Sequence, residues 1–138
     1  MIVLTGGTPT SSTPDLELEH VHQLARTAAR AAAAKGGDEI LVLDVGHVLA
    51  ICDVFVVTSG RNTRQVRTMA EEVEAQVKAA GGSRPLRIEG LDTAEWVLVD
   101  FGDFVVHIFL DEVRRYYNLE RLWADAPRIE WTEAGARP

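Results

Sequence analysis

The sequence predicts a single domain of the α/β class, more narrowly α+β, in which helices flank a mixed β-sheet of about five strands. Two observations support this fold class. The chain has 138 residues, 46% apolar and 25% charged, which is the size and composition of one compact domain with a substantial core. Segments with helical periodicity also alternate with short β-rich runs, in the order helix, two strands, helix, three strands, helix.

The first helix is expected to begin at Asp15. Residues 1–14 are rich in Thr, Ser, Gly and Pro and have little to bury, so they are expected to form a flexible N-terminal tail. Beyond Asp15 apolar residues recur at helical spacing, until Gly36 and Gly37 end the pattern. The folded domain is therefore expected to span residues 15–124, with a C-terminal tail over 125–138.

Two β-rich runs, 39–45 and 50–60, follow the first helix, and Gly46 with His47 is a candidate hairpin turn between them. A second helix then begins after Asn62, whose side chain can cap it. We expect its apolar residues to face the core: Val66, Met69, Ala70, Val73 and Val77.

A third strand is expected within 85–90, and the stretch "EWVLVDFGDFVVHIF" (95–109) predicts a hairpin that turns at Gly102 and Asp103. Strand alternation places one set of side chains in the core: Val97, Val99, Phe101, Phe104, Val106 and Ile108. The opposite set faces either a helix or a partner: Trp96, Leu98, Asp100, Val105, His107 and Phe109. Residues 111–123 complete the pattern as a last helix.

Charge and cysteine content exclude several classes of function. A net charge of −7 disfavours sequence-independent binding to nucleic acids, whereas a basic protein partner is compatible with it. Cys52 is the only cysteine and lies in an apolar run, so no intramolecular disulfide and no cysteine-based zinc site can form. No apolar run approaches the ~20 residues of a membrane span and no export signal is recognisable, so we expect a soluble, cytoplasmic protein.

The motifs that suggest catalysis have ordinary structural explanations. Asp-Phe-Gly (100–102) lacks the glycine-rich loop and the other motifs of a kinase. The loop "TSGRNT" (58–63) could present backbone N–H groups and Arg61 to a phosphate, but an ordinary connection with an Asn cap is favoured. The four acids that could suggest a metal cluster fall at a strand end, a turn and a helix start, which does not favour one: Asp100, Asp103, Asp111 and Glu112. No cofactor or metal is therefore expected.

Two interpretations of Trp96 stay open: an aromatic residue packed under a helix, or the anchor of an interface. His107 is expected to be a packing residue, since a lone His among apolar strand residues is seldom a ligand or base. A surface that mixes aromatic and acidic side chains suits a basic protein partner.

The segments "IEGLDTAEWVLVDFGDFVVHIF" (88–109) and "DEVRRYYNLERLW" (111–123) together closely resemble the ribosomal silencing factor family, also called RsfS or Iojap. "ILVLDV", "CDVFVVTSG" and "NTRQVRTMAEEVE" match the same family in the same order. The resemblance implies a nucleotidyltransferase-like fold without that enzyme's metal-binding acids. It also implies a protein that is no enzyme and makes no direct sequence-specific contact with nucleic acid.

The same resemblance implies a mechanism by occupancy. Family members are expected to bind the large ribosomal subunit through ribosomal protein L fourteen, to block joining of the small subunit and to repress translation during starvation or stationary phase. A homodimer is implied for the free protein. Two alternatives stay open: a nucleotide-binding or nucleotidyl-transferring enzyme that uses the "TSGRNT" loop, and a structural dimer module that buries its Trp96 face against a second copy.

Carried over by residue, the resemblance makes Trp96 an apolar anchor, with Glu89, Asp100 and Asp103 as acids that face Lys and Arg of the ribosomal protein. Tyr117, in a signature it shares with Glu120 and Trp123, either completes this surface or packs its helix. For Arg64 the resemblance leaves open whether it contacts the partner or a local acid.

Overall fold

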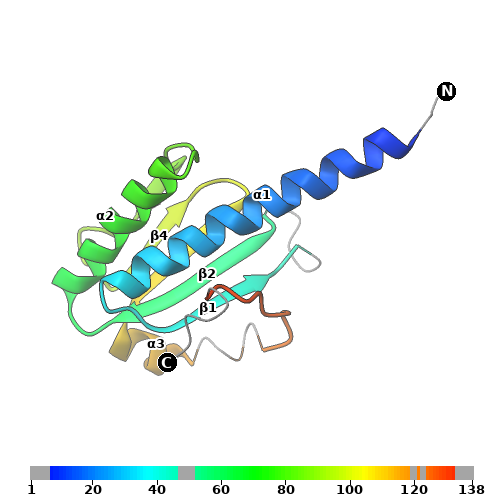
Figure 1. Ribbon diagram of the computed structural model, residues 1–138. Helices are drawn as coiled ribbons and strands as arrows, with labels where there is room; N and C mark the ends of the chain where they lie inside the picture. Colours follow the sequence, from blue (N-terminus) through cyan, green and yellow to red (C-terminus); the bar gives the residue numbers. More distant parts are fainter. Residues whose placement is uncertain (1–6, 47–51, 119–120, 122–123, 133–138) are drawn as a thin grey trace.

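The computed structural model describes residues 7–46, 52–118, 121 and 124–132, with side chains described from Leu16 onward. Over these residues the chain forms one five-stranded sheet, in the order β1-β2-β5-β4-β3, with α-helices packed on it (Figure 1). The elements are α1 (Gly7–Ala34), β1 (Asp38–Asp44), β2 (Val54–Gly60), α2 (Thr63–Ala79), β3 (Arg87–Glu89), β4 (Trp96–Asp100), β5 (Phe104–Leu110) and α3 (Asp111–Tyr117). The predicted α+β class and element order are confirmed.

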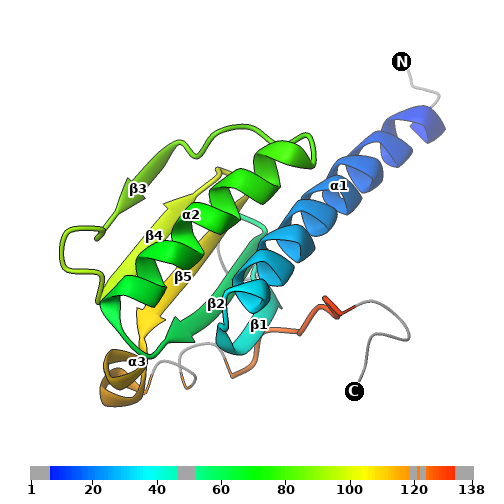
Figure 2. The same ribbon diagram turned by 60° about the vertical axis from the view of Figure 1, so that its left-hand side comes forward.

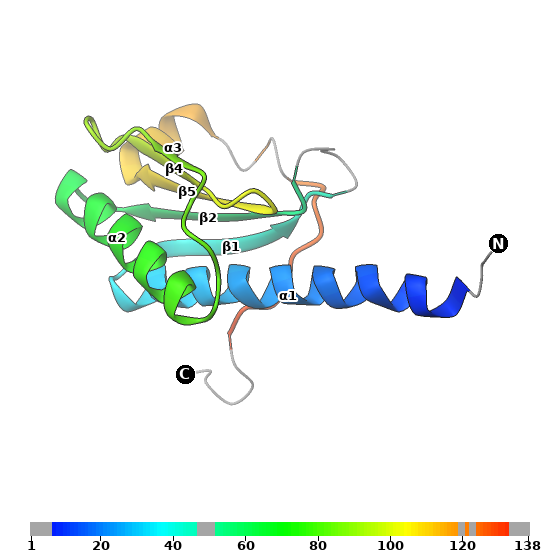
Figure 3. The ribbon, with the colours of Figure 1, turned by 90° about the horizontal axis from the view of Figure 1, so that it is seen from above.

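The sheet is mixed, since β2 and β5 are parallel whereas the other neighbouring strands are antiparallel. The chain passes from β2 through α2, β3 and β4 before it returns as β5, so β3 is left at one edge of the sheet (Figure 2). Helices α1 and α2 cover one face, and α3 lies on the opposite side at one end (Figure 3). The two faces are therefore covered to different extents.

The main core lies between the sheet and the helices α1 and α2. The predicted apolar face of α2 is buried, as is the predicted core face of the last hairpin from Val97 to Ile108. Ala25, Ala28, Ala29 and Ala32 are completely buried on α1, because methyl side chains let the helix approach the sheet closely. Both predictions of core residues are confirmed.

The turn between β4 and β5 has the predicted form. Gly102 adopts φ of 95°, a left-handed conformation that glycine takes without steric cost. Phe101 N–H donates to the Phe104 carbonyl at 3.0 Å, and the two rings stack with centroids 4.7 Å apart. This closure sets the register in which Trp96 lies opposite Phe109 and Asp100 opposite Val105.

The first helix begins earlier than predicted. Helix α1 begins at Gly7, so residues 7–14, which we expected within a flexible tail, are helical (Figure 1). Adding residues to an existing helix costs much less than nucleating one, so a segment of poor helix formers can continue a helix that its neighbours have formed. The candidate turn residue His47 and the first predicted residues of the second strand, Ala50 and Ile51, lie outside the described residues.

The last helix is shorter than predicted. It ends at Tyr117 because Asn118 adopts a left-handed conformation with φ of 52° and caps the helix with its backbone N–H. Of the residues that resemble the family signature beyond this point, Leu119, Glu120, Leu122 and Trp123 lie outside the described residues.

The segment 127–131, expected to belong to a C-terminal tail, packs on the domain, and we call it the C-terminal strap. Asp44 N–H donates to the Pro127 carbonyl at 2.8 Å, and Ile129 N–H donates to the Val42 carbonyl at 2.7 Å, so the strap pairs with the outer edge of β1. Ile129 and Trp131 pack against the main core. The sequence did not reveal this pairing, because a short segment that pairs with a distant strand edge has no periodic signal.

Candidate functional site

The less covered face of the sheet carries four ring-bearing residues, Phe55, His107, Phe109 and Trp96, which we call the aromatic row. His107 lies edge-on to Phe55 with ring centroids 4.5 Å apart, and Trp96 lies 4.9 Å from Phe109. The row runs from β2 across β5 to β4, from the buried middle of the sheet toward its open edge. Phe109 and His107 are buried, whereas 42% of Trp96 is exposed. Trp96 is therefore the member of the row that a partner can reach.

The Trp96 indole is hydrogen-bonded inside the protein. Its Nε1–H donates to Nδ1 of His107 at 3.1 Å. Because Nδ1 accepts, the neutral imidazole of His107 carries its proton on Nε2. Burial lowers the pKa of His107 to about 4, and the negative charge of Asp100 opposes this shift more weakly. His107 is thus a buried packing residue, as predicted, with a hydrogen-bonding role that the sequence did not reveal.

A shallow hollow of about 370 Å³ lies beside Trp96 and is lined by Glu89, Gly90, Trp96 and Leu98. Gly90 has φ of 89°, and a Cβ atom there would lie 2.1 Å from the carbonyl oxygen of Trp96. Only glycine fits so close an approach of β3 to β4. The exposed carboxylate of Glu89 and the exposed ring of Trp96 therefore border the same hollow.

Two arrangements hold the loop that leads into Trp96. The Arg67 guanidinium, from α2, donates to the Leu91 carbonyl at 3.0 Å and to the Asp92 carbonyl at 2.8 Å. Leu110 N–H donates to the Glu95 carbonyl at 2.8 Å. These bonds hold the backbone that precedes Trp96. Sequence analysis missed Arg67, because the pattern of a helix does not show which of its Arg side chains contacts a distant loop.

Asp100 makes internal contacts at the far end of β4. Its carboxylate accepts from Gly102 N–H at 2.8 Å and lies 3.3 Å from Nε of Arg87, and its side chain is only 18% exposed. Arg87 also lies 3.5 Å from Glu89, so it links the two predicted acids. Four residues of β-strand, about 13 Å, separate Asp100 from Trp96. The carboxylate of Asp100 therefore mainly holds Arg87 and the turn in place, and it is less available for contact with a partner.

Asp103 lies on the turn beyond Asp100, away from Trp96. It borders a different hollow together with Asp53 and the N-terminal part of α1, including Leu16 and His20. Its backbone carbonyl accepts from Asp53 N–H at 2.9 Å. The structure therefore does not bring Asp103 together with Trp96, because alternation assigns residues to a face and gives no information about distance along the strand.

Tyr117 and Arg64 lie on helices at the other end of the sheet. Tyr117 is 59% exposed on α3, next to Tyr116, which is 81% exposed. Both tyrosines border a hollow with Glu95, the residue before Trp96, so Tyr117 lies at the Trp96 end of the surface. Arg64 is exposed in the first turn of α2, which belongs to the layer on the opposite face of the sheet.

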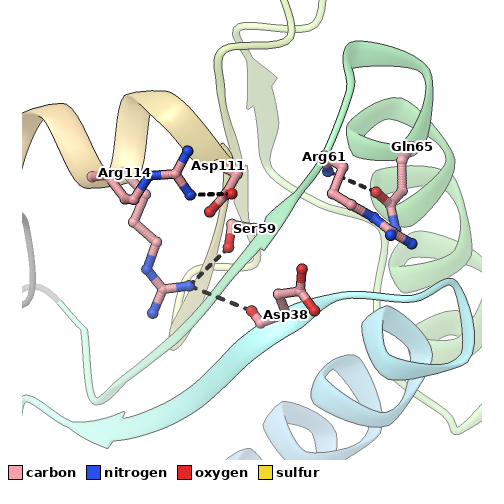
Figure 4. A network of polar contacts seen from close by, with 7 residues as sticks. Asp38, Ser59, Arg61, Gln65, Asp111 and Arg114 are labelled. Atoms are coloured by element: carbon pink, nitrogen blue, oxygen red, sulfur yellow. Dashed lines mark hydrogen bonds and ion pairs between the residues drawn. The ribbon is translucent and has the colours of Figure 1, made fainter.

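The "TSGRNT" loop uses its polar groups within the fold. Gln65 Oε1 accepts from Arg61 N–H (Figure 4). Asn62 accepts from Gln65 N–H at 2.8 Å, and Gln65 Nε2 donates to the carbonyls of Lys35 and Gly36. The interpretation as a helix connection with an Asn cap is confirmed. Among the described residues, no group of three or more His, Cys, Asp or Glu side chains is arranged to hold a metal ion.

Arg114 joins α3 to the sheet and was missed by sequence analysis. It is 2% exposed, and its guanidinium donates to Ser59 Oγ at 3.1 Å and to the Asp38 carbonyl at 3.4 Å (Figure 4). The guanidinium also donates to the Glu39 carbonyl at 2.9 Å. Glu39 has φ of 47° at an irregular point of the β1–β2 register. At this irregular start of β1, backbone carbonyls lie outside the regular hydrogen bonding between the two strands, and Arg114 supplies donors for them.

The sequence also matches a known protein family over most of its length. The family model described as "Ribosomal silencing factor during starvation" matches residues 18–138. The chain belongs to the ribosomal silencing factor family. It is 42% identical over 102 residues to ribosomal silencing factor RsfS of Bacillus subtilis (strain 168), which covers 74% of this chain and 86% of that protein. Membership in this family makes it a regulatory protein rather than an enzyme.

Other members of the family show how widely the domain occurs. A mouse protein named "Mitochondrial assembly of ribosomal large subunit protein 1" is 36% identical over 87 residues, which are 62% of this chain and 38% of that protein. A crystal structure of a Chromobacterium violaceum protein superposes with a TM-score of 0.71 at 34% identity, covering 82% of this chain and 93% of that one. The family fold is thus shared with an experimental structure.

Proposed function

We propose that this protein acts in the cytoplasm, where it binds the large ribosomal subunit through ribosomal protein L fourteen, blocks joining of the small subunit and so represses translation during starvation. Family membership supports the ribosome as the target. In this mechanism the bound protein blocks the small subunit sterically, and no chemical reaction is required. Among the described residues, no helix has the length and apolar character needed to cross a membrane.

The observation that carries the proposal is the half-exposed, hydrogen-bonded Trp96 beside the carboxylate of Glu89. Large aromatic side chains at the centre of a surface, held in one orientation, are the usual anchors of protein interfaces. Glu89, at the rim of the same hollow, and Glu95, the residue before Trp96, are both exposed, and the chain carries a net charge of −7. Such a surface is complementary to Lys and Arg side chains of a basic ribosomal protein.

We propose Trp96, Glu89 and Tyr117 as direct contacts, because they lie at one end of the less covered face of the sheet. Asp100 contributes through Arg87, which its carboxylate holds. Asp103 and Arg64 lie off this surface, so contacts through them require a partner that extends around the edge of the domain.

Co-sedimentation with isolated large subunits tests the proposal. The wild-type protein should sediment with the subunits and prevent added small subunits from joining, whereas Trp96→Ala should need a much higher concentration to do either. Glu74→Gln on α2, which lies in the layer over the opposite face, provides a matched control and should behave as wild type. Equal binding by wild type and Trp96→Ala would show that the site is wrong, and no binding by wild type would remove the ribosome as the target.

We also propose that the free protein forms a homodimer that uses the exposed Trp96 face, since an uncovered aromatic surface is stabilised by burial against a second copy. Sedimentation equilibrium of wild type and Trp96→Ala measures this. A dimer that survives the substitution unchanged would place the contact elsewhere. A dimer that uses Trp96 must dissociate before the ribosome binds, so the apparent affinity per chain should fall as protein concentration rises above the dimer dissociation constant, and ribosome occupancy should rise less than in proportion to the protein added.

A further inference from the structure

The hydrogen bond between Trp96 and His107 joins two residues that are not directly opposite each other. In the β4–β5 register Trp96 faces Phe109, and Leu98 faces His107. Diagonal neighbours on one face of an antiparallel pair are about 7–8 Å apart, within reach of an aromatic side chain. The indole therefore leans along the sheet from Phe109, with ring centroids 4.9 Å apart, until Nε1 lies 3.1 Å from Nδ1 of His107. Its direction is set by both contacts.

His107 is itself held in place. It is 5% exposed, its ring is edge-on to Phe55 at 4.5 Å, and it is stacked with Phe109 at 6.2 Å. Because burial lowers its pKa to about 4, the imidazole is neutral near neutral pH and Nδ1 is available as an acceptor. The acceptor that receives the indole N–H therefore has a fixed position and a constant protonation state.

We propose that His107 is a positioning residue, which fixes the orientation of the Trp96 indole so that one ring face is presented to the partner. The inference rests on the proposed function, because it assigns His107 to the same contact surface. The indole N–H is used internally, so the partner meets the π-face of Trp96 and not a hydrogen-bond donor. A Lys or Arg side chain fits this arrangement, since its stem packs on the ring, its charge is attracted to the π-face, and Glu89 lies at the rim of the same hollow.

The expected effect on binding comes from pre-organisation. A side chain that is ordered before association loses less conformational entropy when the complex forms. Without the acceptor, the indole is mobile in the free protein and loses conformational entropy on binding, or its N–H is buried without a hydrogen-bond partner. Either case costs binding free energy. Removing the acceptor should therefore weaken binding to the large subunit about three- to tenfold, mainly through faster dissociation.

Nuclear magnetic resonance tests the contact without a partner. A scalar coupling across the hydrogen bond should join Trp96 Nε1 to His107 Nδ1 in the uniformly ¹⁵N-labelled protein, with Trp96→Phe used to assign the indole signal. Loss of the acceptor in His107→Leu should remove the coupling and lower the order parameter of the Trp96 indole N–H. Absence of the coupling in the wild type, or an unchanged order parameter in His107→Leu, would overturn the proposal.

Binding measurements separate positioning from packing. His107→Leu removes the acceptor but fills the space, whereas His107→Asn places Oδ1 near the position of Nδ1 and should restore most of the affinity. Phe55→Leu is the packing control: it removes a ring that touches His107, while burial and the stacked ring of Phe109 still hold the imidazole and the Trp96 hydrogen bond is left intact. Its affinity for large subunits should equal that of the wild type.

The outcomes distinguish the two proposals. Weaker binding by His107→Leu, rescue by His107→Asn and no effect of Phe55→Leu support positioning. Equal binding by all four proteins overturns it while the proposed function survives, and equal loss in His107→Leu, His107→Asn and Phe55→Leu overturns it by showing that packing alone matters. If the wild type does not bind subunits, the proposed function fails, and the coupling and order parameter still decide whether His107 orients Trp96.

Discussion

The two faces of the sheet are formed by alternate residues of the same strands, yet their side chains differ in kind. On the face covered by α1 and α2, the last hairpin contributes mainly aliphatic side chains: Val97, Val99, Val106 and Ile108 are completely buried, and the stacked Phe101 and Phe104 follow only at the turn. On the other face, the same hairpin contributes three members of the aromatic row, the buried His107 and Phe109 and the half-exposed Trp96. Aliphatic side chains fill a core through shape alone, whereas aromatic side chains add hydrogen bonds and oriented faces that a partner can use. One face mainly provides stability, and the other can provide recognition.

The largest expected effect is a loss of stability on the covered face. Ile108→Ala should lower the free energy of unfolding by about 3 kcal/mol, because it leaves a cavity in a closely packed core. Leu98→Ala, on the partly exposed face of β4, should cost less than about half as much. Urea denaturation of both variants measures the difference. Similar losses for the two substitutions would show that the faces do not differ in this way.

The next effect concerns pH. The pKa of His107 is lowered from 6.5 to about 4, so between these pH values the unfolded chain binds a proton that the folded chain does not. The free energy of unfolding should therefore fall as the pH is lowered from about 6.5 to about 4, with a contribution from His107 of about 2 to 3 kcal/mol. Denaturation series at several pH values should show a steeper decline for the wild type than for His107→Leu. Parallel declines would mean that His107 titrates normally in the folded protein.

Recognition should depend on Trp96 more than on its neighbours. Trp96→Ala should weaken binding to the large subunit by about 2 kcal/mol, roughly thirtyfold, as is typical for an interface anchor. A fluorescence-independent measurement, such as sedimentation with labelled subunits, avoids the loss of the reporter ring. An effect below threefold would move the anchor to another residue.

The smallest expected effect belongs to the charged rim. Glu89→Gln should weaken binding by about 0.5 to 1 kcal/mol, chiefly through slower association that depends on salt. It should leave stability unchanged, because the ion pair between Glu89 and Arg87 is exposed. Association rates at two ionic strengths test this, and a rate constant that does not depend on salt would exclude electrostatic steering by Glu89.

The features that depend on residues close together in the sequence could be predicted. The alternation in the last hairpin placed every core residue from Val97 to Ile108 correctly, and the turn at Gly102 followed from its residue types. The Asn62 cap was likewise predictable, since it involves residues three apart. In each case the interaction lies within a few residues along the chain, or follows directly from the period of the strand.

Interactions between distant segments could not be predicted in the same way. Arg114 and Arg115 are adjacent, yet Arg114 is buried against Ser59 and Glu39 whereas Arg115 pairs with Asp111 one turn away on the surface. Only the second contact has a sequence signal, the i,i+4 spacing of opposite charges. The candidate site shows the same limit, because Asp100 and Asp103 share a hairpin with Trp96 and still lie at its other end.

The C-terminal strap has a consequence for how copies of this protein can associate. It occupies the outer backbone groups of β1 at Val42 and Asp44, while Arg114 takes the carbonyls of Asp38 and Glu39 at the start of the strand. The three-residue β3 is thereby left as the more open edge among the described strands. A sheet with both edges free can add copies without limit and form fibres. With one edge closed by the chain itself, any pairing of strands between molecules is exhausted after two copies. The strap thus sets an upper bound on growth, whichever surface the ribosome uses.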